Sequence, residues 1–538
     1  MKQSLSLKLL ATVGLLFLSR YCFAFTPIDW KTCPDNPTFQ CGFLIVPTDY
    51  KNPGAGTIQL PVTLHKASGH SLGTIVYNYG GPWGDNVSAL HHFYNDYSAE
   101  IKENFDLATF NPRGVSPNTI ECYSDQIDLV HKIDRKYDLT YFNTEKGART
   151  SFEIASKKSA LCQYQKNSLY PYVGTKNTVQ DMDLLRQALY VDTIDYYGVS
   201  YGTRLGLAYL ITYPQHVSNM VLDSNHSPDN DFLKFTQDKA LAIENALHHS
   251  FDLCVAAGNK CPLYRSSSSE IQADFQKLMQ EAQTTGIPTS KKYNHRPFTA
   301  AMLSNLVFDA IYTSDLWPGH AAAMKQAMIS NNADLLMDLY MNEGGINGSE
   351  YNPVTNSYKT YDDSGLNLPN IVVCTDYFIP ALFQKIESWM QVSDTLRAQN
   401  PLLGGQYSSI QSTICTHWLG NSQPLLPNSV LPITQVQPNV LVVGNAYDPG
   451  TPLVWSQSVS DYLTKLNVNN TLLAWEGMGH ASYHFNAPLN GCVDNNVDNF
   501  FMTGKLPVTK ICNDQINPFE QNDTHKKIIR KIFPVMKF

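Results

Sequence analysis

A serine between two glycines is the residue in this chain best placed to do chemistry. The stretch reads Gly198-Val199-Ser200-Tyr201-Gly202, with a β-prone run before it at 193–197 and an apolar, helix-spaced run after it at 204–211. A tight turn between a strand and a helix holds such a serine in a strained conformation, with its hydroxyl beside the helix N-terminus. The pattern also arises by chance, so the prediction that Ser200 is a nucleophile depends on partners elsewhere.

A serine nucleophile needs a base to take its proton, and the base needs a carboxylate to orient it. Asp448 follows an apolar run at 439–445 and begins a rigid Asp-Pro-Gly-Thr-Pro turn, and His480 lies in a glycine-flanked loop after the run at 470–475. The carboxyl ends of parallel strands meet at one edge of a sheet. We therefore predict that Ser200, Asp448 and His480 are nucleophile, acid and base. Asp223 also ends an apolar run and remains an alternative acid.

Acyl transfer also requires two N–H donors for the oxyanion that develops on the substrate. The first predicted donor is the backbone N–H of Tyr201, the residue after the serine. The second is Gly81, in the loop Gly80-Gly81-Pro82 after an early apolar run. An ordinary Gly-Pro turn is the alternative interpretation of that loop.

The elements around these residues alternate between strands and helices. Strands are predicted at 57–64, 73–79, 105–110, 193–197, 219–223, 439–445 and 470–475, and a helix at 178–189; residues 25–56 are expected to be irregular. This alternation predicts an α/β fold with a mostly parallel sheet and helices on both faces. Between 229 and 425 the pattern is mainly helical. The predicted organisation is a core at 25–228, a helical insertion at 229–425 and the rest of the core at 426–538.

Composition narrows the class of protein. The chain has 538 residues, of which 43% are hydrophobic and 16% charged, with a net charge of -8, which is typical of a globular protein. The absence of a basic run argues against nucleic acid as a partner. No cysteine or histidine spacing predicts a metal site, and serine acyl transfer requires no cofactor, so none is expected. The oligomeric state is not indicated.

Residues 1–24 have the features of a signal peptide. Lys2 and Lys8 precede an apolar run at 9–18, and Cys22-Phe23-Ala24 is an acceptable cleavage site. The run is too short to span a bilayer, so no stable membrane association is expected. A lipoprotein anchored at Cys22 is an alternative, but Arg20 does not suit the position it would occupy. We expect a periplasmic or secreted protein.

The cysteines agree with export. The chain has 11, and loss of Cys22 leaves an even number, which in an oxidising compartment predicts five disulfides. The simplest arrangement joins neighbours in sequence, although sequence does not determine connectivity, and free buried thiols are the alternative. The pairs would be Cys33–Cys41, Cys122–Cys162, Cys254–Cys261, Cys374–Cys415 and Cys492–Cys512.

Taken together, the motifs resemble one known family. They are Gly80-Gly81-Pro82, Pro112-Arg113-Gly114, Gly198-Val199-Ser200-Tyr201-Gly202-Thr203, Cys374-Thr375-Asp376, Asp448-Pro449-Gly450-Thr451-Pro452, Gly477-Met478-Gly479-His480 and Gly504-Lys505-Leu506-Pro507. The chain resembles the secreted tripeptidyl aminopeptidase and prolyl aminopeptidase branch of the α/β-hydrolases, including the C-terminal region of the tripeptidyl enzymes. The resemblance implies the α/β-hydrolase fold, a helical lid over the site, and the same three catalytic residues.

Two positions depart from the family. An aspartate usually stands where this chain has Asn111, and the change is expected to weaken a local ion pair with Arg113. A glycine usually stands where this chain has Trp83. We expect Trp83 to bind substrate and to narrow the acyl-side pocket, so the family's substrate length does not transfer.

The resemblance implies an exopeptidase that removes one to three residues from the N-termini of peptide substrates. Such an enzyme needs a carboxylate in the lid to bind the substrate's ammonium group, and the candidates are Asp376, Glu350, Asp362 and Asp363. An esterase or lipase would use the same triad, so the triad does not separate the two activities. A non-catalytic binding protein that has kept the fold is the third hypothesis.

Overall fold

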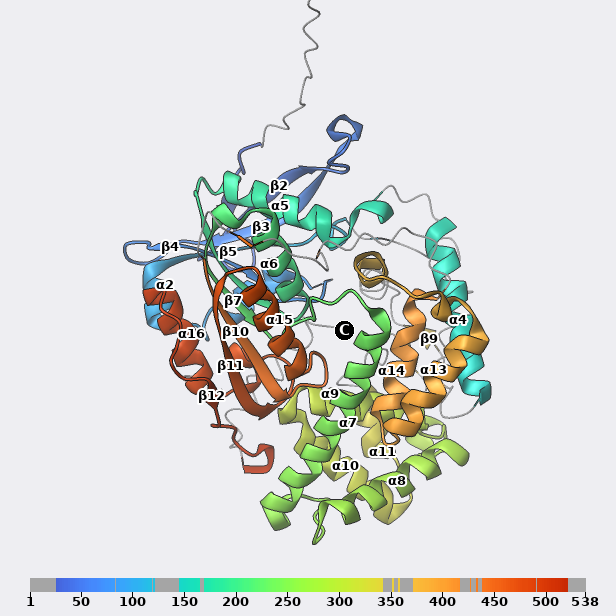
Figure 1. Cartoon of the computed structure of the whole chain (residues 1–538). Helices are drawn as coiled ribbons and strands as arrows, with labels where there is room; N and C mark the ends of the chain where they lie inside the picture. The colour runs from blue at the N-terminus through green and yellow to red at the C-terminus, as the bar shows by residue number, and fades with distance from the viewer. Residues whose placement is uncertain are drawn as a thin grey trace, which may run out of the picture.

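A ten-stranded sheet is the framework of one half of the molecule, on the left in Figure 1. In this computed structural model the described residues are 26–82, 84–118, 120, 145–164, 169–341, 351–352, 357–358, 371–416, 426, 432–433, 438–489 and 491–520. The strand order is β1-β2-β3-β5-β4-β6-β7-β10-β11-β12. Neighbours are antiparallel from β1 to β5 and parallel from β5 to β12.

The strands span Lys31–Thr32 (β1), Gln40–Pro47 (β2), Thr57–His65 (β3), Gly73–Asn78 (β4), Phe105–Phe110 (β5), Ile194–Val199 (β6), Val217–Asp223 (β7), Asn439–Tyr447 (β10), Asn469–Met478 (β11) and Ile511–Cys512 (β12). The segment 25–56 was expected to be irregular, and that expectation is wrong, because β2 pairs with β3 along its whole length. Glycine, cysteine and proline within β2 conceal its pattern, and pairing with β3 outweighs their low strand preference.

Helices cover both faces of the sheet. One face packs on α5 (Thr175–Ala188), α6 (Tyr201–Thr212) and α15 (Leu453–Lys465), and the other on α1 (Asn86–Phe93), α2 (Ala99–Asn104) and α16 (Cys492–Thr503). Strand β10 shows the reason: Val440 and Val442 join the first cluster, and Leu441 and Val443 join the second. Successive strand side chains point to opposite faces, so a continuous apolar run buries both.

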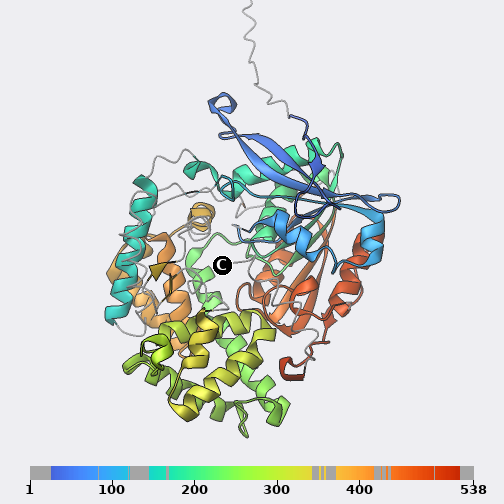
Figure 2. The same ribbon diagram turned by 180° about the vertical axis from the view of Figure 1, so that it is seen from behind.

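A helical cap lies to one side of the sheet (Figures 1 and 2). Its helices are α7 (Phe232–Ala257), α8 (Ser268–Thr284), α9 (Ala300–Tyr312), α10 (Trp317–Ser330), α11 (Asp334–Leu339), α13 (Ile386–Gln399) and α14 (Gly404–Ser412). Within the described residues, nothing between β7 and β10 joins the main sheet; the short strands β8 (Tyr351–Asn352) and β9 (Ser357–Tyr358) pair only with each other. Helix α4 (Glu145–Tyr164) precedes β6 in sequence, yet Phe152 on α4 packs on Trp389 of α13.

A buried carboxylate holds the cap together. Glu244 on α7 accepts hydrogen bonds from the backbone N–H groups of Leu402, Leu403 and Gly404 at 2.8, 3.0 and 3.0 Å. These donors lie at the N-terminus of α14, where backbone N–H groups have no partners within the helix and a negative charge is favourable. No helix in the described part of the chain is both long and apolar enough to cross a membrane.

Four disulfides are present among the described residues. They join Cys33 to Cys41, Cys254 to Cys261, Cys374 to Cys415 and Cys492 to Cys512, which are neighbour pairs in sequence. The expected Cys122–Cys162 bond lies outside the part of the structure that is described, as does Trp83. The bond at Cys374 links the segment after 371 to the short helix Thr413–Cys415, and both segments belong to the cap.

The expectation that Asn111 weakens an ion pair of Arg113 is wrong, because Arg113 has its partner on another element. Arg113 is fully buried and forms a bidentate pair with Asp181 of α5, at 2.7 Å from Nε to Oδ2 and 2.5 Å from Nη2 to Oδ1. Asn111 instead donates from Nδ2 to Asp85 Oδ1 at 3.0 Å and accepts from the backbone N–H of Val87 at 3.0 Å. Asparagine suits this position better than aspartate, because its amide N–H donates a hydrogen bond to the Asp85 carboxylate and an aspartate has no such donor.

Candidate active site

Ser200 lies in the tight turn between β6 and α6. Its backbone has φ 56° and ψ -122°, a strained conformation for a residue with a side chain. Its backbone N–H donates to the carbonyl of Asp223 at 3.0 Å, which ties the turn to β7. A Cβ at Gly198 would lie 2.5 Å from the carbonyl oxygen of Gly202, and one at Gly202 would lie 2.6 Å from the carbonyl oxygen of Asn78. The two glycines are therefore required by close backbone approach.

Asp448 and His480 follow the adjacent parallel strands β10 and β11 and are in contact. His480 Nδ1 lies 3.0 Å from both carboxylate oxygens of Asp448, and both side chains are buried. Within the described part of the chain, His480 Nε2 has no hydrogen-bond partner. This geometry holds a proton on Nδ1 and leaves Nε2 able to accept one. Ser200 follows β6, two strands away from β10 along the same parallel edge.

The turn after β10 fixes the Asp448 carboxylate. Oδ1 accepts from the backbone N–H groups of Gly450 and Thr451 at 2.7 and 2.9 Å, and Oδ2 accepts from Thr451 Oγ1 at 2.9 Å. Thr451 Oγ1 also lies 3.1 Å from His480 Nδ1. Sequence reasoning missed Thr451, although its place in the Asp-Pro-Gly-Thr-Pro turn was a usable signal.

Asp223, the alternative acid, faces a different part of the same loop. Its Oδ2 accepts from the backbone N–H groups of Ser482 and Tyr483 at 3.0 and 2.9 Å and from Tyr197 Oη at 3.1 Å. Burial raises the pKa of this carboxyl, and these hydrogen bonds oppose the rise. Among the described residues, the carboxylate hydrogen-bonded to the His480 ring is that of Asp448, and Asp223 positions the chain just after His480.

The glycine loop after β4 packs directly on the serine turn. Gly80 has φ 89° and Gly81 has φ 110°, conformations that favour glycine. A Cβ at Gly80 would lie 2.7 Å from the carbonyl oxygen of Val199 and 3.0 Å from Ser200 Cβ. Tyr201 begins α6, and its hydroxyl is 2.6 Å from Thr175 Oγ1 on the neighbouring helix. The loop and the helix start therefore flank Ser200.

The cap supplies one neighbour of the histidine that no sequence pattern indicated. The carbonyl of Tyr312, at the end of α9, accepts from the backbone N–H of His480 at 2.8 Å. The two rings pack with their centroids 4.5 Å apart. Burial raises the pKa of the Tyr312 phenol well above its ordinary value, so the side chain is neutral near His480. Tyr312 lies far from His480 in sequence, and only the folded cap brings them together.

Asp376, one of the candidate ammonium-binding acids, is already paired. It is buried, it accepts from the backbone N–H of Thr175 at 3.1 Å, and it lies 3.7 Å from Arg204 Nε on α6. Burial raises the pKa of its carboxyl, and the charge of Arg204 opposes the rise. The Arg204–Asp376 pair joins the serine helix to the cap. The other candidates, Glu350, Asp362 and Asp363, lie outside the described residues.

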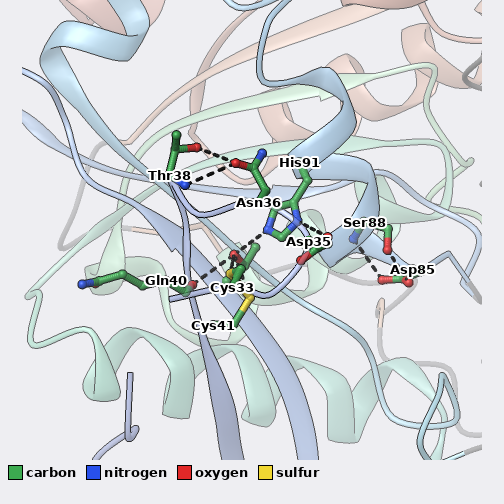
Figure 3. The surroundings of a disulfide bond; sticks show 10 residues. Cys33, Asp35, Asn36, Thr38, Gln40, Cys41, Asp85, Ser88 and His91 are labelled. Atoms are coloured by element: carbon green, nitrogen blue, oxygen red, sulfur yellow. Dashed lines mark hydrogen bonds and ion pairs between the residues drawn. A yellow bond between two sulfur atoms is a disulfide. The ribbon is translucent and has the colours of Figure 1, made fainter. Parts of the chain in front are cut away.

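One group in the described part of the chain has possible ligand atoms close enough together to suggest a metal site. Its atoms lie within 4.8 Å of one another and belong to Cys33, Cys41 and His91. Figure 3 shows the cysteines joined as a disulfide and His91 directed toward Asp35. His91 Nδ1 lies 2.9 Å from Asp35 Oδ2, and Nε2 lies 2.9 Å from Thr63 Oγ1. Both sulfurs are bonded to each other, so they offer no thiolate to a metal.

Two family models match the chain. The model described as alpha/beta hydrolase fold matches residues 89–300, and the model described as TAP-like protein matches residues 400–512. The fold is that of the α/β-hydrolases. The sequence-based prediction of this fold, and of a resemblance to the tripeptidyl aminopeptidases, is confirmed.

Curated relatives include two named as peptidases and one named as an esterase. The chain is 25% identical to tripeptidyl aminopeptidase of Streptomyces lividans over 89% of this chain and 85% of that protein. It is 27% identical to serine protease Hip1 of Mycobacterium tuberculosis over 63% and 69%, respectively. It is also 27% identical to carboxylesterase B of Mycobacterium tuberculosis over 90% and 89%. The relatives therefore indicate a hydrolase, with both peptide and ester bonds represented among their names.

Proposed function

We propose that this α/β-hydrolase is an exported serine peptidase that cleaves peptide bonds near the N-termini of peptides through an acyl-enzyme. The observation that carries the proposal is the Asp448–His480 pair, held at 3.0 Å with His480 Nε2 unpartnered in the described part of the chain. It lies on the sheet edge where the strained turn presents Ser200. In this assignment Ser200 is the nucleophile, His480 the base and Asp448 the acid.

The first half of the reaction forms an ester. His480 Nε2 takes the proton from Ser200 Oγ as that oxygen attacks the substrate carbonyl carbon, and Asp448 stabilises the imidazolium that results. The tetrahedral intermediate collapses, and His480 returns the proton to the departing amine. Thr451 contributes by orienting both members of the acid–base pair through its hydroxyl.

The second half releases the acyl group. A water molecule loses a proton to His480 and attacks the ester, and Ser200 Oγ leaves with the returned proton. In both halves the substrate oxygen becomes negative and needs fixed donors. The backbone N–H groups of Tyr201 and Gly81 fill this role in the proposal, because the Gly80-Gly81 loop contacts the serine turn and Tyr201 begins α6.

The preference for peptides rests on the relatives. Tripeptidyl aminopeptidase matches nearly the whole chain, and Hip1 is a serine protease by name. Export rests on residues 1–24, whose composition is that of a signal peptide, and on the four disulfides. Peptides outside the cytoplasm are thus the proposed substrates.

An esterase is the second candidate, favoured by one specific observation. Carboxylesterase B matches this chain as extensively as the peptidase does, over 90% of its length. Ester and peptide hydrolysis share the acyl-enzyme route, so the acid–base geometry supports both. What separates them is whether the site accepts a peptide amide with a free N-terminus.

The deciding experiment compares three substrate classes on the purified chain without residues 1–24. These are peptide anilides with a free amine, the same anilides with a blocked amine, and short acyl esters. The aminopeptidase proposal predicts that kcat/KM for the free-amine anilides exceeds that for the blocked anilides. Equal cleavage of blocked and free anilides would contradict the N-terminal specificity, and cleavage of esters alone would favour the esterase.

A variant control ties the activity to the proposed nucleophile. Ser200→Ala is expected to lower kcat by several orders of magnitude, because it removes the attacking atom. Ser458→Ala, on the exposed face of α15, is the matched control for loss of a hydroxyl and should retain activity. Full activity in Ser200→Ala would refute the nucleophile assignment.

A further inference from the structure

Lys239, on the cap helix α7, is a cation that the proposed reaction does not use. It is half-buried, and its ammonium group lies 5.5 Å from the centre of the Phe235 ring. Among the described residues, its ammonium group has no hydrogen bond or ion pair. Its neighbour Lys234 differs, because Asp238 Oδ2 lies 2.5 Å from the Lys234 ammonium group. A desolvated cation without a counterion is costly, so its presence calls for an explanation.

Contacts connect Lys239 to the start of α15, which follows the Asp448 turn. Phe235, beneath its ammonium group, stacks on Trp455 with ring centroids 4.9 Å apart. Trp455 lies in the first turn of α15, just after the Asp448 turn, and its indole Nε1 donates to Asp238 Oδ2 on α7 at 2.7 Å. This contact joins α7 to the core at the point where the proposed acid emerges.

His226 connects the same cluster to the serine turn. Its ring centroid lies 6.0 Å from that of Phe235, and its backbone N–H donates to Thr203 Oγ1 at 3.0 Å. Thr203 Oγ1 in turn donates to the carbonyl of Ser200. A series of contacts therefore runs from the cap to the nucleophile turn through Lys239, Phe235 and His226.

The electrostatics agree with this placement. Burial lowers the pKa of Lys239 to about 8, and the negative charge of Asp448 partly opposes that decrease. Burial also lowers the pKa of His226, and the charges of Arg204, Lys239 and His480 lower it further. Lys239 is thus within electrostatic range of the acid, and Lys239 and His480 both act on His226. At neutral pH the lysine is mostly charged, and a bound anion would stabilise that charge.

We propose that Lys239 binds a carboxylate of the substrate and gives the enzyme a preference for anionic peptides. The proposal rests on the proposed peptidase function for the nature of the substrate. A lysine suits this role because it is a compact charge on a flexible stem, and the Phe235 ring beneath it limits its hydration. The carboxylate has two sources in a peptide, an acidic side chain or the C-terminus.

Binding to the inactive Ser200→Ala protein tests the proposal without turnover. One peptide set is amidated and carries Glu in place of Gln at each position in turn; the other compares a free C-terminus with its amide. All have a free N-terminus, and calorimetry gives each Kd. We expect at least one anionic member to bind roughly tenfold more tightly than its neutral match, the scale of one charge-assisted hydrogen bond. The peptide set in which the anionic member binds more tightly shows whether the carboxylate comes from an acidic side chain or from the C-terminus.

Added substitutions assign the preference to this residue. Lys239→Met should abolish the preference, and Lys239→Arg should retain most of it. Lys277→Met, on the exposed surface of α8, removes the same charge elsewhere and should leave the preference intact. Equal binding of anionic and neutral peptides, or a preference that survives Lys239→Met, would overturn the proposal. Peptide cleavage by the unmodified enzyme is measured separately. Cleavage without a preference for anionic peptides would refute only the role of Lys239. A preference for anionic peptides without cleavage would refute only the peptidase function.

Discussion

Replacing Asn111 with aspartate should destabilise this protein in a pH-dependent manner. Asn111 is buried, and its Nδ2 donates to Asp85 Oδ1 at 3.0 Å. Its Oδ1 accepts from the backbone N–H of Val87. The Asn111→Asp variant keeps the second hydrogen bond and replaces the first with two facing carboxylate oxygens.

The structure sets the size of the effect. Two unit charges about 3 Å apart repel by about 5 kcal/mol at an effective dielectric constant near 20. The pair can avoid this by binding a proton, which costs about 4 kcal/mol at pH 7 for a carboxyl with an ordinary pKa. The cost of protonation, about 4 kcal/mol, is the smaller of the two and sets the upper limit. Because Asp85 is only half-buried, the expected loss in the free energy of unfolding is about 2–4 kcal/mol.

The sign of the pH dependence follows from proton linkage. The folded variant would hold a proton that the unfolded chain has released, so the pKa of the carboxyl pair is raised by folding. Its stability is therefore close to that of the unmodified protein at about pH 4 and is lost as the pH rises toward 7. Urea unfolding of the oxidised protein, followed by tryptophan fluorescence at both pH values, measures the difference.

An uncharged variant is the control. Asn111→Ala removes the hydrogen bonds with Asp85 and Val87 without adding a carboxylate. Its loss of stability should therefore be nearly the same at pH 4 and at pH 7. The reasoning is refuted if Asn111→Asp is as stable as the unmodified protein at pH 7, or if its deficit is the same at both pH values.

Three further predictions concern single side chains. Asp448→Asn should lower kcat by about 10⁴ in steady-state assays with little change in KM, because it favours the wrong His480 tautomer; a loss below tenfold would argue against the assignment. Thr451→Val should lower kcat roughly tenfold, through loss of the hydroxyl that lies 2.9 Å from Asp448 and 3.1 Å from His480, and an unchanged kcat would remove Thr451 from the mechanism. Burial raises the pKa of Asp195 from 3.8 to about 6, so folding stability falls by up to about 3 kcal/mol as the pH rises from about 4 to about 6. Asp195→Asn should remove this fall in urea unfolding at pH 4 and 7, and a persistent fall would assign it to another group.

The sequence alone determined most of the strand framework and where the predicted catalytic residues lie on it. Apolar runs of the right length indicated β5 at its observed bounds and β10 and β11 to within a few residues. Ser200, Asp448 and His480 each follow a predicted strand. Because parallel strands align their carboxyl ends, this placement was enough to predict that the three residues lie at one edge of the sheet. Local patterns succeed here because strand burial and glycine-rich turns are local requirements.

The tertiary structure decided the contacts between distant segments. The partner of Arg113 is Asp181 on α5, not its neighbour in sequence, because the folded chain buries the two side chains against each other. Tyr312 reaches His480 from a cap helix, and no local pattern marks it. The choice between Asp448 and Asp223 required distances, since both follow parallel strands and only the path of the loop after β11 brings one of them to the His480 ring. Strand ends follow from local sequence, whereas which side chains meet depends on how the cap and loops pack over them.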